Sequence, residues 1–207
     1  MHRLAYASHG RASTALAVTA VVLAAPMSVA AAQARDTTRA GAQQAAPQQA
    51  ATRTSPPARP SDVRSMEAIV AALYDVISGP AGQKRDWDRF RSLFAPGARL
   101  IPARPLPTGG AEAVVLTPDD YVQRAAPRLE KDGFFEREVA AKTEAFGNIA
   151  HRFSTYESRH AAGDAQPFAR GINSIQLLKD GDRWWVVTIF WDSERAGNPI
   201  PKEYLPR

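Results

Sequence analysis

The stretch "RGINSIQLLKDGDRWWVVTIFW", Arg170–Trp191, decides the fold of this chain. Two runs rich in Ile, Val, Leu and aromatic residues flank the polar sequence KDGDR. β-Branched and aromatic residues favour β-strands, and a glycine between polar residues is typical of a tight hairpin turn. The stretch therefore predicts two long antiparallel strands that are joined directly to each other.

The tryptophans of the second strand indicate where its two faces lie. Successive side chains on a strand point to opposite faces, so Trp185 and Trp191 would share one face and Trp184 would lie on the other. We interpret Trp185 as core and Trp191 as the wall of a pocket, with simple core as the alternative for Trp191. Trp184 would lie on an outer face covered by a second copy of the chain, or else be a solitary exposed side chain.

Three segments upstream have the pattern of helices. Apolar residues recur at a spacing of three and four in "MEAIVAALYDVIS", residues 66–78, and again in "DWDRFRSLFAPGA", residues 86–98. Thr117 is a candidate N-cap with Pro118 at the first helical position, although Pro127 would break or kink the second half of that helix.

The rest of the pattern is that of strands. Residues 98–103 and 112–116 form short apolar runs, and long β-type runs cover residues 134–147 and 148–160 before the final hairpin. Helices that come early and a meander of long strands that comes late predict an α+β fold. We expect a strongly curved antiparallel sheet wrapped around three N-terminal helices.

The span from Met66 to about Glu194 resembles the nuclear transport factor 2-like superfamily, which includes the SnoaL-like cyclases and the ketosteroid isomerases. The resemblance rests on "MEAIVAALYDVISG", "DWDRFRSLFAPGARLIP" and "RGINSIQLLKDGDRWWVVTIFW", in the places of the family's helices and paired last strands. These motifs are mostly structural. The resemblance implies a cone-shaped sheet that is open at one end to a pocket, and a homodimer.

The N-terminal third does not have the composition of a folded domain. Residues 1–32 begin with basic residues, continue with an apolar run and end in small residues, which predicts a secretory signal peptide and a periplasmic or secreted protein. A transmembrane anchor is the alternative, but polar residues and a proline interrupt the run. Residues 33–64, rich in Ala, Gln and Pro, predict a disordered linker, which leaves residues 65–207 as the domain.

Charge and composition exclude several functions. The net charge is +5, yet residues 65–207 hold 19 Lys and Arg against 19 Asp and Glu, so no nucleic-acid partner is expected. The chain has no cysteine, which excludes disulfides, thiol catalysis and iron–sulfur clusters. No convergent set of metal ligands and no phosphate-binding glycine motif is present, so we expect no metal and no cofactor.

A few polar residues are candidates for a pocket. His151 is expected to point inward because its neighbour Arg152 favours solvent, and an imidazole has the near-neutral pKa that a general base needs. A hydrogen-bonded structural histidine is the alternative. Together with Tyr74, Phe94, Asn173 and Trp191, His151 would line an apolar cavity with a few polar groups, as small-molecule sites do.

The resemblance does not extend to a known catalytic residue. Ketosteroid isomerases carry a general-base aspartate in the region that reads "IPARPLPTGG" here, residues 101–110, where this chain has no acid. We therefore favour binding of a small apolar ligand without catalysis. The alternatives are an isomerase, cyclase or dehydratase that uses His151 as its base, and a protein-interaction module that uses the sheet face and the tail, residues 198–207.

Overall fold

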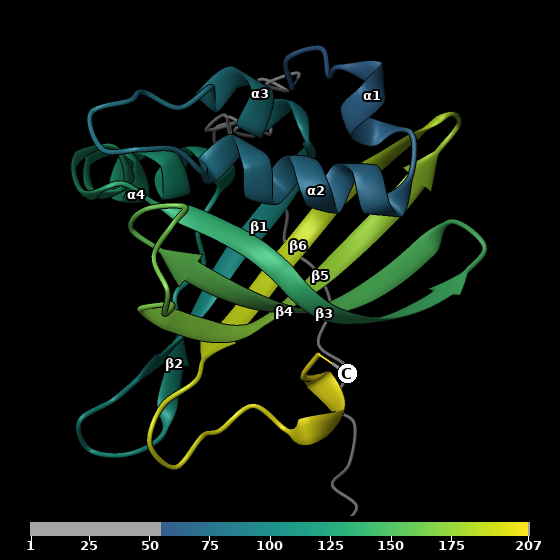
Figure 1. Ribbon diagram of the computed structural model, residues 1–207. Helices are drawn as coiled ribbons and strands as arrows, with labels where there is room; N and C mark the ends of the chain where they lie inside the picture. Colours follow the sequence, from purple (N-terminus) through teal and green to yellow (C-terminus); the bar gives the residue numbers. More distant parts are fainter. Residues whose placement is uncertain (1–54, 207) are drawn as a thin grey trace, which may run out of the picture. The chain divides into compact units, whose positions relative to one another are not determined.

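The computed structural model describes residues 55–206 (Figure 1), so the expected signal peptide and most of the expected linker lie outside the described residues. The helices are α1 (Pro60–Val63), α2 (Met66–Ile77), α3 (Trp87–Ser92), α4 (Pro118–Asp132) and the 3-10 helix η1 (Lys202–Tyr204). The strands are β1 (Phe94–Pro105), β2 (Ala111–Ala113), β3 (Phe135–Phe146), β4 (Ile149–Arg159), β5 (Ala169–Asp180) and β6 (Arg183–Ser193). The predicted α+β class is confirmed.

The six strands form one open sheet in the order β2-β1-β6-β5-β4-β3. Strands β3 to β6 form the antiparallel meander that the sequence predicts. Strand β1 runs parallel to β6, with Leu100 opposite Ile189, so the expectation of a wholly antiparallel sheet is wrong for this pair. A parallel pair needs a long connection, and α4 with the three strands β3 to β5 provides it here.

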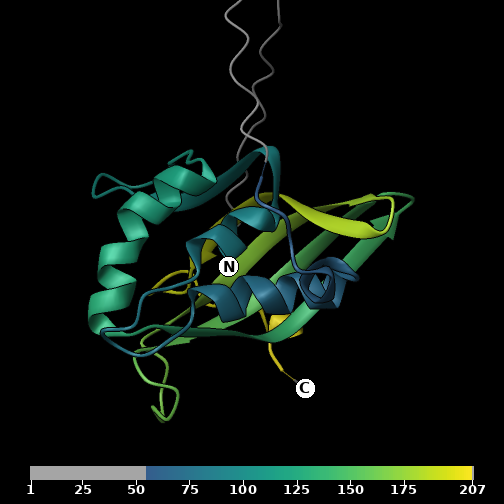
Figure 2. The same cartoon turned by 90° about the horizontal axis from the view of Figure 1, so that it is seen from above.

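Helix α2 packs against the face of the sheet that we call the inner face, and the opposite face is the outer face (Figure 1). Its N-cap is Ser65, whose hydroxyl accepts a hydrogen bond from the Ala68 amide at 3.1 Å. Ile69 and Val70 are buried at the start of the helix, where α1 also packs. Figure 2 shows α2 over the strands and α4 beside it. No helix within residues 55–206 is long and apolar enough to cross a bilayer.

Residues just before α2 pack against the domain, although the sequence assigns them to the linker. Val63 in α1 is 5% exposed and belongs to the main apolar core. Asp62 forms an ion pair with Arg89 of α3, with 2.7 Å between Oδ2 and Nε. The Arg89 guanidinium lowers the pKa of Asp62 through this contact. The described packing of the domain therefore begins before Ser65.

Helix α4 is continuous through Pro127, so of the two expected outcomes, a break or a kink, the break is absent. Thr117 and Asp120 form a capping box, in which the Thr117 hydroxyl accepts from the Asp120 amide at 3.1 Å and the Asp120 carboxylate accepts from the Thr117 amide at 2.9 Å. Val122 and Leu129 are buried on either side of the proline. Packing of both halves offsets the one backbone hydrogen bond that a proline removes.

Arg85 connects the end of α2 to the last turns of α4. Its side chain is buried and donates hydrogen bonds to the carbonyl oxygens of Ile77 at 3.0 Å, Gly79 at 2.5 Å and Leu129 at 3.1 Å. Backbone carbonyl oxygens accept these hydrogen bonds from the guanidinium, although a carboxylate is the more usual partner of a buried arginine. These hydrogen bonds fix the distance between the end of α2 and the last turns of α4.

A bulge in β6 reverses the expected positions of two tryptophans. Gln176 pairs with Thr188 but Leu177 pairs with Val186, so Val187 is the extra residue and the alternation of faces shifts there. As a result Trp184 is 9% exposed within the core, and its predicted place in an interface is wrong.

Trp185, which the sequence predicts as core, is only half-buried and is not part of the core. The Arg183 guanidinium lies 3.2 Å from the centre of its ring, as in a cation–π contact.

Candidate functional site

A cavity of about 410 Å³ lies on the inner face of the sheet, between the C-terminal half of α2, α4 and strands β3 to β6. Apolar and aromatic side chains form most of its wall, among them Leu73, Phe90, Tyr121, Ile175 and Ile189. Its volume is within the range of small-molecule sites. This cavity is the candidate functional site.

The structure brings three of the five predicted site residues together at this cavity. Tyr74, Asn173 and Trp191 all line it, and the Asn173 side-chain amide donates a hydrogen bond to the Tyr74 hydroxyl at 3.1 Å. Trp191 packs edge-to-face against Tyr121, with 6.5 Å between the ring centres. Phe94 and His151 do not line the cavity.

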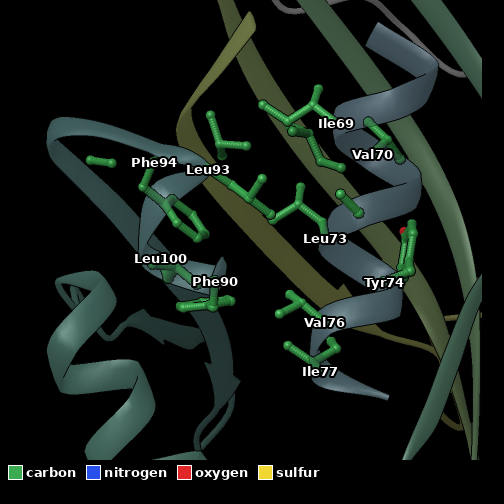
Figure 3. Close-up of a cluster of buried hydrophobic side chains, with 14 of the residues drawn as sticks. Ile69, Val70, Leu73, Tyr74, Val76, Ile77, Phe90, Leu93, Phe94 and Leu100 are labelled. Carbon is green, nitrogen blue, oxygen red and sulfur yellow. The ribbon is translucent and has the colours of Figure 1, made fainter. Parts of the chain in front are cut away.

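Phe94 lies in the core beside the cavity rather than in its wall. Its side chain is 1% exposed, and its ring centre lies 4.7 Å from that of Phe90 (Figure 3). Phe90, one turn earlier in the chain, lines the cavity in its place. Phe94 is the first residue of β1, two residues after the end of α3, and its pairing with Val186 directs its side chain into the core.

His151 lies on the outer face, so the expectation that it points inward is wrong. Its Nε2 is 2.9 Å from the Ser174 hydroxyl, and its ring packs against Phe153. The prediction assumed that Arg152 would face solvent. Arg152 instead lies on the inner face, where its Nε donates to the Glu138 carboxylate at 2.8 Å. An acid on the neighbouring strand therefore reverses the preference of the arginine.

The acidic residue in the interior of the cavity is Glu136, near the start of β3, which the sequence analysis did not single out, whereas Asp132 borders the cavity from an exposed position. Its backbone amide donates to the Ser78 hydroxyl at 3.0 Å, and Ser78 in turn donates to the Tyr74 carbonyl at 2.6 Å. These bonds join β3 to the end of α2. They place the Glu136 carboxyl in the cavity at a fixed depth.

The surroundings of Glu136 favour its neutral form. Burial raises the pKa of Glu136 to about 7, although hydrogen bonds from Ser158 and Asn173 act in the opposite direction. The Ser158 hydroxyl donates to Oε2 at 2.7 Å. Glu136 retains some accessible surface because it faces the hollow of the cavity. A carboxyl with a pKa near 7 can donate or accept a proton at neutral pH.

A chain of hydrogen bonds fixes the orientation of the polar groups. Ser154 donates to the Glu138 carboxylate at 2.6 Å, so its oxygen accepts the proton of the Tyr74 hydroxyl at 2.7 Å. Tyr74 is therefore the donor in that bond and the acceptor of the bond from Asn173. The Asn173 side chain also lowers the pKa of Glu136. The bond to Tyr74 holds the Asn173 amide in one orientation.

Tyrosine rings form a large part of the wall and remain uncharged. Burial raises the pKa of Tyr74 and of Tyr121 well above the usual value, and that of Tyr156 to about 12. The nearby Glu136 carboxylate acts in the same direction on all three. The Tyr156 hydroxyl is 3.1 Å from the Ser193 hydroxyl. These residues thus offer aromatic faces and neutral hydroxyl groups.

Aromatic residues also lie at the rim of the cavity. The His160 ring stacks on Phe168 with 4.2 Å between centres, and Phe168 packs edge-to-face on Phe134. His160 Nδ1 donates to the Gly133 carbonyl at 3.2 Å. His160 and Phe168 are exposed, and all three rings border the cavity.

A weak sequence signal for Glu136 exists in "FFEREV", residues 134–139. The two acids are two residues apart and therefore share one face, with Arg137 on the other. A pair of acids on the face of a strand that carries no arginine is consistent either with a polar site or with solvent. Only the position of α2 decides between these, because it covers that face.

Within residues 55–206, no group of three or more His, Cys, Asp or Glu is placed to hold a metal ion. The cavity contains one buried carboxyl, and the acid next to it on the strand, Glu138, is paired with Arg152. Glu136 and Asn173 line the cavity together with the hydroxyl-bearing Tyr74, Tyr121 and Tyr156.

No family model and no curated protein matches the chain. Similar solved structures include a cystatin-like-fold protein of unknown function from Nostoc punctiforme, with 12% identity, a TM-score of 0.48 and coverage of 63% of this chain and 90% of that one. An NTF-2 like protein of unknown function from Silicibacter pomeroyi has 15% identity, a TM-score of 0.43 and coverage of 62% and 92%.

An NTF2-like protein of unknown function from Shewanella baltica has 14% identity, a TM-score of 0.37 and coverage of 61% of this chain and 89% of that one. The nuclear transport factor 2-like superfamily is also the one that the sequence resembles. These likenesses concern the fold alone.

Proposed function

We propose that the domain binds a small, mainly apolar molecule in the inner-face cavity, and that one polar group of this molecule hydrogen-bonds Glu136. The observation that supports this most is the combination of a hollow of about 410 Å³ with apolar walls and one protonatable carboxyl. Burial of a carboxyl costs free energy, and a protein without a use for it would place an apolar side chain there.

The proposal includes export, because residues 1–32 have the pattern of a signal peptide. The ligand would then be a molecule met outside the cytoplasm. A second copy of the chain on the outer face also stays a prediction, to which Trp184 does not contribute. Val187 and Phe190 are the exposed apolar side chains on that face of β6.

The test uses a neutral probe, 2-phenylethanol, and the purified protein. Ile189→Trp adds a large ring inside the cavity, and Val187→Trp adds the same ring on an exposed position of the same strand. We expect NMR shifts of cavity residues on titration with the probe in the wild type and in Val187→Trp, and none in Ile189→Trp. Equal binding by both variants, or no binding by the wild type, would contradict the proposal.

A second candidate function is proton transfer to and from the bound molecule by Glu136. The pKa of about 7 supports it, because a general base works best when its pKa is close to the ambient pH. Glu136 replaces His151 in this role, since His151 lies on the outer face. The test is exchange of α-hydrogens of a bound ketone probe, such as phenylacetone, for deuterium. Exchange that is equal in wild type and Glu136→Gln would rule it out.

A further inference from the structure

We infer that the preferred ligand of the cavity is an organic cation, an amine with an apolar body, whose ammonium group binds between the Glu136 carboxylate and the aromatic wall. This inference rests on the proposed function and names the class of ligand. It depends on three properties of the cavity: an acid without a basic partner, aromatic faces around that acid, and the distribution of charge at the rim.

The first property is that Glu136 has hydrogen-bond donors but no counter-ion among the described residues. Ser158 and Asn173 are the groups that stabilise its charged form. The comparable acid on the same strand, Glu138, forms a bidentate ion pair with Arg152. A buried carboxylate without a partner is costly, and a ligand cation would remove that cost.

The second property is the aromatic wall. Tyr121, Tyr156, Trp191 and Phe134 line the cavity together with Glu136. Tyr121 stacks on Phe90 at 5.4 Å and meets Trp191 edge-on, so its position is fixed. Aromatic faces attract cations, and several rings around one position form the usual site for an ammonium group.

The third property is the charge at the rim. Arg128 and Asp132 both border the cavity and lie 3.8 Å apart as an i, i+4 pair on α4. Their charges offset each other, so the cavity has a net negative charge whenever Glu136 is ionised. A carboxylate ligand would meet repulsion from Glu136, and a neutral ligand would leave it without a counter-ion.

Several ionisable groups could influence the pH dependence of binding. The tyrosines stay neutral because their pKa values are raised, and Glu138 is balanced by Arg152. The ionisable groups that line the cavity beside Glu136 are Tyr74, Tyr121, Arg128, Asp132, Tyr156 and His160. Those that line a neighbouring pocket, to which Tyr74 and Glu136 also contribute, are Glu67, Asp75, Arg137, Glu138, Arg152, Arg159 and Asp164. Among the groups that line the cavity, Glu136 is the one whose pKa is raised to about 7.

The test compares three probes that share a phenyl ring: 2-phenylethylamine, 2-phenylethanol and phenylacetate. Dissociation constants would be measured by NMR titration at about pH 8 and about pH 5.5, on either side of the raised pKa of Glu136. We expect the amine to bind about tenfold more tightly than the alcohol at the higher pH, because hydrogen bonds to charged groups are the strong ones. Phenylacetate should bind most weakly.

Glu136→Gln is the matched variant, since it keeps the shape of the side chain and removes its charge. It should bind amine and alcohol within about twofold at both pH values, while the wild type shows this equality only at the lower pH. Ser158→Ala provides a second line of evidence. It removes a donor to Glu136, raises the pKa of that carboxyl and should move the onset of amine preference to higher pH. His151→Gln, at a histidine on the outer face that does not border the cavity, should leave the preference unchanged.

The outcomes separate the two proposals. If the alcohol binds in the cavity and the amine binds no more tightly, or if Glu136→Gln keeps the preference, the cation inference is wrong and the binding cavity remains. If none of the probes shifts cavity residues, the proposed function fails and the inference fails with it. Preference for the amine that disappears in Glu136→Gln supports both.

Discussion

The two ends of the inner face differ sharply although the same strands form both. At one end, α1 and the start of α2 cover Leu177, Trp184 and Val186, and all three are buried. At the other end, the same strands carry Asn173 and Trp191 beside a cavity that contains Glu136. Apolar side chains are closely packed at the first end, whereas the second end has a cavity with polar groups in its wall. Stability should therefore depend on one end and binding on the other.

The largest expected effect is a loss of stability at the packed end. Ile69→Ala should lower the free energy of unfolding by about 3–5 kcal/mol, because the side chain is fully buried and its removal leaves a hole. Ile189→Ala removes the same atoms next to an existing cavity and should cost about 1–2 kcal/mol. Urea denaturation of both variants measures the difference. Equal losses would mean that the two ends are equally packed.

The second prediction concerns the pH dependence of stability at the hollow end. The pKa of Glu136 is raised from 4.5 to about 7, so the folded state holds a proton that the unfolded state releases between these values. Stability relative to Glu136→Gln should be greatest below about pH 4.5 and should fall by about 1–3 kcal/mol as the pH rises through 7. Thermal denaturation across this range measures it. A constant difference between the two proteins would contradict the raised pKa.

The third prediction tests the hydrogen-bond chain that holds Asn173 and Tyr74. Ser154→Ala removes the acceptor of the Tyr74 hydroxyl and should lower stability by about 1–3 kcal/mol. It should also weaken binding of the probe by allowing Asn173 to turn. Ser174→Ala, which removes a half-buried hydroxyl on the outer face, is the control and should cost less than about 1 kcal/mol. Equal losses of stability in Ser154→Ala and Ser174→Ala would show that this chain of hydrogen bonds does not stabilise the fold.

The smallest effect is expected at His151. His151→Ala should change stability by less than about 1 kcal/mol, because the ring is half-buried on the outer face and has one hydrogen bond. Affinity for the probe should stay within about twofold, since the side chain does not border the cavity. NMR titration of this variant beside the wild type measures the affinity, and urea denaturation measures the stability. A large loss of affinity would show that binding in the cavity is coupled to contacts on the outer face.

Much of the fold could be predicted because its signals are local. The spacing of apolar residues in α2, the cap at Thr117 and the turn between β5 and β6 each depend on residues close in sequence. The break at Pro127, one of the two outcomes expected there, and the wholly antiparallel sheet were wrong for a different reason. In the first case packing outweighed a backbone preference, and in the second a distant strand, β1, joined the sheet beside β6.

The candidate site was predicted less completely. The alternation of side chains along a strand predicts the inner face correctly for Asn173 and Trp191. The pairing of β5 with β6 is regular around these two residues. Trp184 and Trp185 come before the bulge at Val187, so their side chains lie on the faces opposite to those that the alternation counted back from Trp191 predicts. A bulge of this kind has no clear signature in the sequence "WWVVTIFW". The faces of one strand could therefore be assigned only in part.

The sequence by itself determined the α+β class, the positions of α2, α4 and the long strands, the neutral charge of the domain and the lack of thiol chemistry. These properties depend on composition or on neighbours in the chain. Only the tertiary structure decided that Glu136 is the acid of the cavity, that His151 faces outward and that Arg152 faces inward. The physical reason is that the cost of a buried charge depends on which partners surround it, and those partners come from β3, β4, β5 and α2.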